Sequence, residues 1–337
     1  MKVWTALFGP QDAAVRARSL YERGVGGVFT FEGPHDVFTP LTLASAVDGL
    51  DLMTNVAIAF PRNPIHVAHQ AHDLQLLSGG RFRLGLGTQI RTQIEKRFGA
   101  EFDHPVRRMT EYVAALHAIF DCWQNGTRLD FRGEFFTHRL MTPTFSPGPN
   151  PFGPPPILVG ALGPRLTRAV ASSADGLLVM PFTTDRFVRE AMLPRVDAGL
   201  ADAGRAREDF AVIPEVIVAT GLDDPERTIA DDAARRLLSF YGSTPAYRPV
   251  LELHGWGDLQ TELNRLSKLG RWAEMGTLID DDVLDTFVAR GTPTEVAQKI
   301  RARTAGVADE VGLYQAFPMA DDTLAALVGE LTADPGV

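Results

Sequence analysis

Two residues near the start of the chain carry side chains that can move a proton, Glu32 and His35. A glutamate can act as a general acid or base, and a histidine exchanges a proton near neutral pH. Both follow an apolar segment, residues 26–31. If this segment is a parallel strand, Glu32 and His35 lie just past its carboxyl end. We predict a role in proton transfer for each, with the alternative that Glu32 caps a loop and His35 hydrogen bonds to backbone.

A glycine-containing turn later in the chain has the composition of an anion-binding site. It follows the apolar residues 157–159 and consists of Gly160, Ala161, Leu162, Gly163, Pro164 and Arg165. Glycine lets a ligand approach the backbone, proline suits the first position of a helix, and the free N–H groups at a helix start attract anions. We predict a phosphate site here, to which Arg165 adds a positive charge. A plain strand-to-helix turn is the alternative.

A second glycine-containing segment ends another expected strand. Residues 64–77 have helical spacing, begin at a proline and stop before two glycines, and residues 82–86 then form a short apolar strand. Three residues at the carboxyl end of that strand would offer backbone to a ligand: Gly87, Thr88 and Gln89. Ile90 stands where a dinucleotide fingerprint has its third glycine, so a Rossmann nicotinamide site is not expected.

Other groups of reactive residues have simpler interpretations. His66, His69 and His72 are three residues apart, which spreads them around a helix, so we predict no metal site. Asp280, Asp281 and Asp282 precede an apolar helical segment and are expected to cap it. Cys122 is the single cysteine and has apolar neighbours, so we expect a buried core residue rather than a catalytic thiol.

The elements that must position these residues alternate between apolar strands and helices. The expected strands are residues 3–7, 26–31, 54–60, 82–86, 157–160, 175–180, 210–219 and 311–316. Eight such strands with helices between them predict an α/β protein with a (β/α)8 TIM barrel, whose ligands bind at the carboxyl ends of the strands. A doubly wound parallel sheet is the weaker alternative.

We expect one domain, residues 1–337, with two additions to the barrel. Residues 127–156 are rich in proline and should form an extended loop or hairpin on the surface. An insertion of about residues 222–290 is longer than one crossover needs and should be helical. Thr292, Pro293 and Glu295 then form the capping-box pattern of a helix before the last strand.

Composition restricts the classes of partner. The chain has 337 residues, 45% of them hydrophobic and 22% charged, and a formal net charge of −9. Nucleic acids and anionic membranes attract basic surfaces, so we expect neither as a partner and predict a small-molecule ligand instead. The chain starts without a charged leader and has no run of about twenty apolar residues, which favours a cytoplasmic protein.

Several motifs together resemble a known family. They are the Asn-Pro helix start at residues 63–64, Leu-Ser-Gly-Gly-Arg-Phe at 77–82, Leu-Gly-Leu-Gly-Thr at 84–88 and Ala-Asp-Gly at 174–176. These motifs are similar to those of the bacterial luciferase-like monooxygenase family, and more narrowly to its branch of deazaflavin (coenzyme F420)-dependent oxidoreductases. The resemblance extends over nearly the whole chain. It implies a TIM barrel, a flavin or deazaflavin on the carboxyl face, and a homodimer.

The resemblance also implies roles for individual residues. The phosphate-binding loop of the family matches Gly160–Arg165, and Gly87, Thr88 and Gln89 match a segment that touches the cofactor. A non-proline cis peptide behind the cofactor ring is expected within residues 57–60, so Ala57, Ile58 and Ala59 are candidate cofactor contacts. Relatives commonly place a histidine directly after the acidic residue at the end of the second strand. This chain has Glu32-Gly33 and keeps its histidine at position 35.

Four functions follow as hypotheses. The first is hydride transfer between coenzyme F420 and a small organic substrate, in which the cofactor does the redox chemistry and Glu32 or His35 supplies a proton. The second is an FMN-dependent monooxygenase that uses molecular oxygen. The third is a barrel that binds a flavin or another ligand without turnover. The fourth is a hydrolase or isomerase that uses two carboxylates, for which Glu32 and Glu215 are the conceivable pair.

Overall fold

The computed structural model describes residues 1–333 and has the predicted (β/α)8 barrel fold. The eight barrel strands are β1 (Lys2–Ala6), β2 (Gly27–Thr30), β3 (Asp51–Thr54), β5 (Phe82–Gly87), β8 (Ile157–Gly160), β9 (Gly176–Val179), β10 (Ala211–Thr220) and β12 (Glu310–Gln315). By its contacts the chain separates into two compact units, which we describe one at a time. The site unit comprises residues 6–178 and 195–212, and the insertion unit comprises residues 1–5, 179–194 and 213–337.

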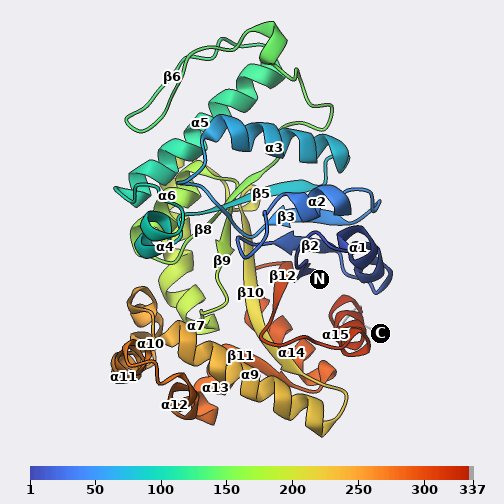
Figure 1. Ribbon diagram of the computed structural model, residues 1–337, viewed down its shortest axis with the longest axis vertical. Helices are drawn as coiled ribbons and strands as arrows, with labels where there is room; N and C mark the ends of the chain where they lie inside the picture. Colours follow the sequence, from blue (N-terminus) through green and yellow to red (C-terminus); the bar gives the residue numbers. More distant parts are fainter. Residues whose placement is uncertain (334–337) are drawn as a thin grey trace. The chain divides into compact units, whose positions relative to one another are not determined.

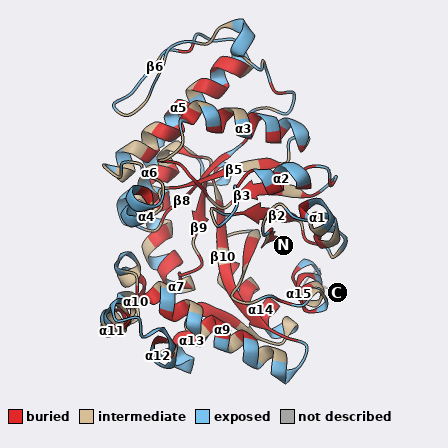
Figure 2. Cartoon of the chain, in the orientation of Figure 1, coloured by how far each residue is buried: buried red, intermediate tan, exposed pale blue. Residues whose placement is uncertain are grey.

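The site unit contains the parallel strands β2, β3, β5, β8 and β9, paired in that order. Its helices are α1 (Ala13–Glu22), α2 (Thr39–Ala44), α3 (Pro64–Leu77), α4 (Arg91–Lys96), α5 (Pro105–Asn125), α6 (Pro164–Ser173), most of α8 (Leu193–Ala203) and the short η3 (Arg207–Asp209). Helices α3 and α5 lie side by side (Figure 1). The strands of this unit are buried along most of their length (Figure 2), which explains their continuous apolar sequences.

The helix and strand around the double glycine form as predicted. The side chain of Asn63 accepts a hydrogen bond from the backbone N–H of Ile65 and caps α3, and Pro64 occupies the first helical position. The helix ends because Gly79 and Gly80 adopt φ values of 65° and 86°, which glycine tolerates best. Strand β5 then begins at Phe82.

The expected third strand, residues 54–60, is wrong in its bounds. The barrel strand is β3, which ends at Thr54, and a separate two-residue strand β4 (Ala57–Ile58) pairs with the carboxyl end of β5. Leu52 and Met53 are fully buried, as is Ala57, so both segments look like core in sequence. Only the pairing partners distinguish them, since β3 pairs with β2 and β5 whereas β4 pairs with β5 alone.

A short hairpin lies within the proline-rich residues 127–156. Strands β6 (Phe131–Arg132) and β7 (Thr137–His138) are antiparallel, and a 3-10 turn, η1 (Pro143–Phe145), follows them. The carboxylate of Glu111 in α5 accepts hydrogen bonds from three successive backbone N–H groups of the hairpin turn, at 2.7 to 2.8 Å. The hairpin is therefore attached to α5 through its backbone, and its own side chains do not predict this contact.

The insertion unit contains strands β11 (Val288–Gly291), β10, β12 and β1, paired in that order and parallel. Its helices are α7 (Asp185–Phe187), η2 (Val188–Met192), α9 (Asp224–Gly242), η4 (Pro245–Tyr247), α10 (Arg248–Leu253), α11 (Gly257–Lys268), α12 (Trp272–Thr277), α13 (Asp281–Phe287), α14 (Pro293–Thr304) and α15 (Asp321–Thr332). Helices α9 to α13 lie within the range given for the insertion, about residues 222–290 (Figure 1). Its expected range also contained most of β11, a strand that the sequence analysis missed.

Both predicted caps in the insertion unit are present. Asp280 accepts a hydrogen bond from the backbone N–H of Val283 and caps α13. Thr292 and Glu295 form a complete capping box at the start of α14. Among residues 1–333, no helix has the combination of length and apolar character that crossing a membrane requires.

Candidate active site

Two of the predicted glycine segments meet at the side chain of Val56. A Cβ atom on Gly87 would overlap Cγ2 of Val56, and a Cβ atom on Gly160 would lie 3.5 Å from its Cγ1. Glycine is therefore needed at the end of β5 because Val56 occupies the space beside it. Val56 itself is half-buried, so part of an apolar surface stays accessible between the ends of β5 and β8.

The cis peptide predicted within residues 57–60 lies outside that range. It joins Asn55 to Val56, directly after β3. Ala57, Ile58 and Ala59, the three candidate cofactor contacts, have side chains that are 0%, 2% and 0% exposed. They are packed in the core because β4 pairs with β5, and Val56 is the residue of this segment that stays accessible.

Glu32 lies in an ion pair at the same place. Both oxygens of its carboxylate contact the guanidinium of Arg62, Oε2 at 2.8 Å and Oε1 at 3.0 Å, and the Glu32 side chain is only 8% exposed. Glu32 Oε2 also accepts a hydrogen bond from the N–H of Ile58 at 3.3 Å, and Arg62 donates to the carbonyl of Ile58 at 2.9 Å. The Glu32–Arg62 pair thus holds both backbone polar groups of Ile58 and fixes β4 next to Val56.

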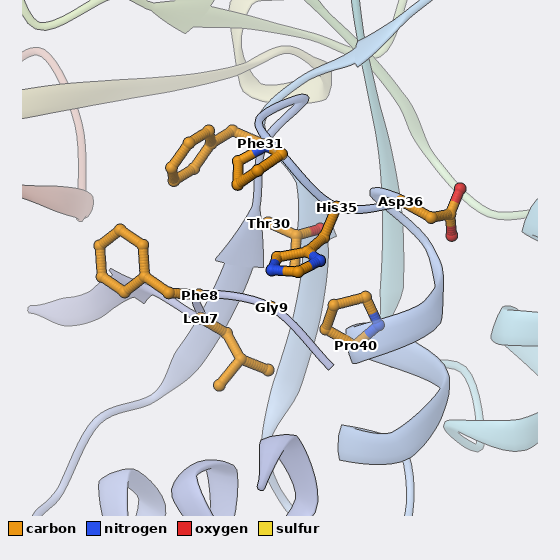
Figure 3. A pocket seen from close by; sticks show the side chains of 9 residues that line it. Leu7, Phe8, Gly9, Thr30, Phe31, His35, Asp36 and Pro40 are labelled. Atoms are coloured by element: carbon orange, nitrogen blue, oxygen red, sulfur yellow. The ribbon is translucent and has the colours of Figure 1, made fainter. Parts of the chain in front are cut away.

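His35 lies on the same loop in very different surroundings. Its imidazole packs over Gly9, where a Cβ atom would come within 2.9 Å of the ring. Within residues 1–333, neither ring nitrogen has a hydrogen-bond partner, and the residue is exposed. His35 borders a cavity of about 160 Å³ that its neighbours Leu7, Phe8, Phe31, Pro34 and Pro40 also line (Figure 3). The imidazole is therefore free to hydrogen bond to a ligand.

The loop that carries His35 is held at both ends. The hydroxyl of Thr30 donates to the carbonyl of Val37 at 2.5 Å, and Asp36 Oδ1 accepts from the N–H groups of Phe38 and Thr39. Burial alone would raise the pKa of Asp36, but the hydrogen bonds from Thr39 and Phe38 hold it below its ordinary value. In Figure 3 the Asp36 carboxylate points away from the His35 ring.

The predicted phosphate turn lies at the start of α6 and is open. Gly163 is the residue before the helix, no side chain caps the first turn, and Pro164 is the first helical residue. The first N–H groups of α6 are consequently unsatisfied by a cap. Gly163, Pro164 and Arg165 are exposed, Leu162 is half-buried and Ala161 is 7% exposed. These residues can hold an anion, since the helix start and the Arg165 guanidinium are both positive.

Thr88 and Gln89 turn the chain out of β5. Both are half-buried, and Gln89 has a φ of 55°, which is unusual for a residue with a side chain. Its side-chain oxygen accepts a hydrogen bond from the N–H of Ile90 at 3.0 Å, which stabilises the turn. Their contact with a cofactor stays a prediction.

Cys122, His69 and His72, for which we predict no chemical role, are buried or half-buried. Burial raises the pKa of Cys122, which is 7% exposed and in its thiol form at neutral pH. His69 and His72 pack against the ring of Trp123, with ring centres 4.6 and 5.6 Å away. In the part of the chain that the structure describes, no three His, Cys, Asp or Glu residues group closely enough to hold a metal ion.

The sequence analysis missed three residues of this site: Val56, Phe8 and Phe31. Phe8 directly follows the expected strand 3–7, and Phe31 is the last residue of the expected strand 26–31, so their position at strand ends could have identified them. Val56 had no such signal, because nothing in the sequence separates it from its buried neighbours.

Comparisons relate the chain to known proteins. The family model of the luciferase-like monooxygenases matches residues 6–310. A protein of Mycobacterium tuberculosis, described as uncharacterised, is 50% identical over 301 residues, which are 89% of this chain and 88% of the relative. A 5,10-methylenetetrahydromethanopterin reductase of Archaeoglobus fulgidus is 29% identical over 273 residues, covering 79% of this chain and 77% of the relative.

A solved structure shows the same fold. The coenzyme F420-dependent tetrahydromethanopterin reductase of Methanopyrus kandleri superposes with a TM-score of 0.81 over 98% of this chain and 97% of that one, at 18% identity. The family model spans most of the chain, and one relative shares half of its aligned residues. The chain therefore belongs to the luciferase-like monooxygenase family, as its sequence motifs predicted.

Proposed function

We propose that this protein is an oxidoreductase that binds coenzyme F420 and uses it to transfer a hydride to or from a small organic substrate. The observation that carries the proposal is the accessible apolar surface at Val56, bordered by Gly87 and Gly160, next to an uncapped helix start. Reductases among the similar proteins support the choice of F420. FMN is the alternative cofactor, because the family takes its name from monooxygenases.

The residues present fit a phosphate-bearing cofactor with a flat ring. A Cβ atom on Gly163 would meet nothing within 4 Å, so there is room above the start of α6 for a phosphate. The half-buried Val56 offers an apolar contact for one face of a ring, and Gly160 beside it is half-buried as well. When bound there, F420 would supply the hydride chemistry.

The chain's own residues would position the ring and handle one proton. The Glu32–Arg62 pair holds Ile58 at both polar groups, so the segment behind the ring keeps one conformation without ligand. This engagement favours a positioning role for Glu32. His35, whose ring nitrogens have no hydrogen-bond partner among residues 1–333, is our choice for the residue that exchanges a proton with a substrate oxygen.

Cofactor titrations test the proposal. Quenching of cofactor fluorescence would be followed as protein is added to F420 and, separately, to FMN. We expect F420 to bind more tightly, and we expect Arg165→Glu to weaken it by roughly tenfold or more, because the substitution replaces an attractive charge at the helix start with a repulsive one. Preference for FMN, or binding of neither cofactor, would contradict the proposal.

A charge-reversal control lies one turn further along the same helix. Arg168 is exposed and pairs with Asp202 on the surface, away from the first turn. Arg168→Glu changes the net charge of the protein by the same amount as Arg165→Glu. We expect it to leave F420 affinity within roughly twofold of the wild type. Equal losses in both variants would point to a general charge effect and not to a phosphate site.

Assembly remains a prediction. The resemblance implies a homodimer, and we propose that state for the protein in solution. Sedimentation equilibrium of the purified protein would test it, and a monomer at all concentrations would overturn it.

A further inference from the structure

The cavity beside His35 has the size of one six-membered ring. Its volume is about 160 Å³, and Figure 3 shows the side chains that line it. In another protein, an apolar cavity of about 150 Å³ binds benzene. Whole ligand sites are typically about 300 Å³ or more, so this cavity fits part of a substrate or a small one.

The walls of the cavity are mostly aromatic and aliphatic. The rings of Phe8 and Phe31 meet edge to face, with centres 5.8 Å apart and an angle of 83° between their planes. They are 66% and 41% exposed, which is unusual for a pair of large apolar side chains at a concave site. A ring placed against them would remove apolar surface from water and could form further edge or stacking contacts.

The polar groups at the cavity restrict the charge of its ligand. Among the described residues that line it, none is a lysine or arginine. Its carboxylate, Asp36, hydrogen bonds to the start of α2 and points away from the His35 ring. A phosphate or carboxylate group would lose its hydration here without gaining a cation, which is unfavourable. An uncharged oxygen can instead hydrogen bond to His35.

We propose that this cavity binds an uncharged six-membered ring of the substrate and that His35 hydrogen bonds to a hydroxyl or carbonyl oxygen on that ring. The identification of the ligand as the substrate rests on the proposed function. Binding of the ring itself requires only the residues of the cavity. The substrate class is therefore a ring alcohol, phenol or ring ketone without an anionic group on the ring.

Fluorine NMR of the cofactor-free protein tests this site with three probes of similar size. They are 4-fluorophenol, 4-fluorobenzoate, which is an anion at neutral pH, and fluorobenzene, which lacks the oxygen. We expect 4-fluorophenol to bind the wild type at least roughly tenfold more tightly than 4-fluorobenzoate. Equal or tighter binding of 4-fluorobenzoate would overturn the proposal.

Matched variants locate the binding. We expect Phe31→Ala to weaken 4-fluorophenol by roughly fivefold, because one wall of the cavity is lost. Phe145→Ala removes another exposed phenylalanine, 71% exposed and outside the cavity, and should change nothing. His35→Phe should still bind fluorobenzene, and it should lose the preference of the wild type for 4-fluorophenol over fluorobenzene. Unchanged affinity in Phe31→Ala, or an unchanged preference in His35→Phe, would refute the site.

Titration of F420 into the same samples separates this proposal from the proposed function. If 4-fluorophenol binds in a Phe31-dependent way but F420 does not bind, the ring site stands and the F420 function is wrong. If F420 binds tightly and none of the probes does, the function stands and the ring site is wrong.

Discussion

Glu32 and His35 lie three residues apart on one loop, and their side chains differ in burial and in contacts. Glu32 is 8% exposed at its side chain and contacts Arg62 and the backbone of Ile58. His35 is exposed and, among residues 1–333, its ring has no hydrogen-bond partner. One titratable group is used to hold the protein in shape, and the other is left available to a ligand.

The surroundings of the two residues differ in the same way. Around Glu32 the contacts involve backbone groups, glycines and a nearly buried ion pair, which allow little rearrangement. Around His35 the contacts involve exposed aromatic rings at the ends of β1 and β2. A rigid surface suits a ligand that is always the same, such as a cofactor. Exposed side chains can be substituted without disturbing the fold, which suits a site that binds different substrates in different proteins.

The largest effect on stability is expected from Arg62→Met. The substitution leaves the Glu32 carboxylate nearly buried without its cation and the Ile58 carbonyl without a donor, which should cost about 3 kcal/mol of unfolding free energy. Urea unfolding followed by circular dichroism would measure it. Glu32→Gln combined with Arg62→Met removes the unpaired charge and should recover part of the loss. A cost below about 0.5 kcal/mol would remove the distinction between the two residues.

The next largest effect is expected from Gly87→Ala. Its Cβ atom would overlap Val56, and the shift needed to relieve the overlap should cost about 2 kcal/mol. Combining it with Val56→Ala should make the loss smaller than the sum of the single losses, because the two side chains compete for one space. Gly329→Ala is the control, since it lies inside α15 with nothing within 4 Å and should stabilise by about 0.5 kcal/mol. Additive losses would contradict contact at Val56.

A smaller, pH-dependent effect is expected from Asp36→Ala. At neutral pH the lost hydrogen bonds to Phe38 and Thr39 should cost about 1 kcal/mol. The unfolded carboxyl has an ordinary pKa of 3.8, and the folded pKa is lower, so the folded state binds fewer protons. The advantage of the wild type should be complete above pH 3.8 and disappear as the pH falls through the lower, folded pKa. Urea unfolding would measure the difference in unfolding free energy between the wild type and Asp36→Ala. A difference that stays constant across this pH range would contradict the prediction.

The smallest effect is expected from His35→Asn. The ring has no hydrogen bonds within the described residues, so its removal should change the unfolding free energy by less than about 0.5 kcal/mol. The same urea unfolding measurement applies. A loss comparable to that of Arg62→Met would show that His35, like Glu32, is a structural residue.

The barrel fold was predictable because its signals are local. Proline at position 64, the glycines after residue 78 and the capping box at Thr292 each act within one or two turns of a helix, and the structure confirms all three. The error at the third strand has a physical reason. Leu52 and Met53 in one segment and Ala57 and Ile58 in the other are all apolar and buried, and the sequence does not state which segment pairs with β2.

The amino-acid sequence by itself determined the alternation of strands and helices, the ends of most barrel strands, the family and the glycine-containing turn at Gly160 to Arg165, because caps, glycines and apolar periodicity act between near neighbours. Only the tertiary structure decided that Glu32 pairs with Arg62, that Val56 fills the space beside Gly87, and that Phe8 and Phe31 form one wall of a cavity with His35. These contacts join residues from different strand ends, and their distances depend on how the strands pair.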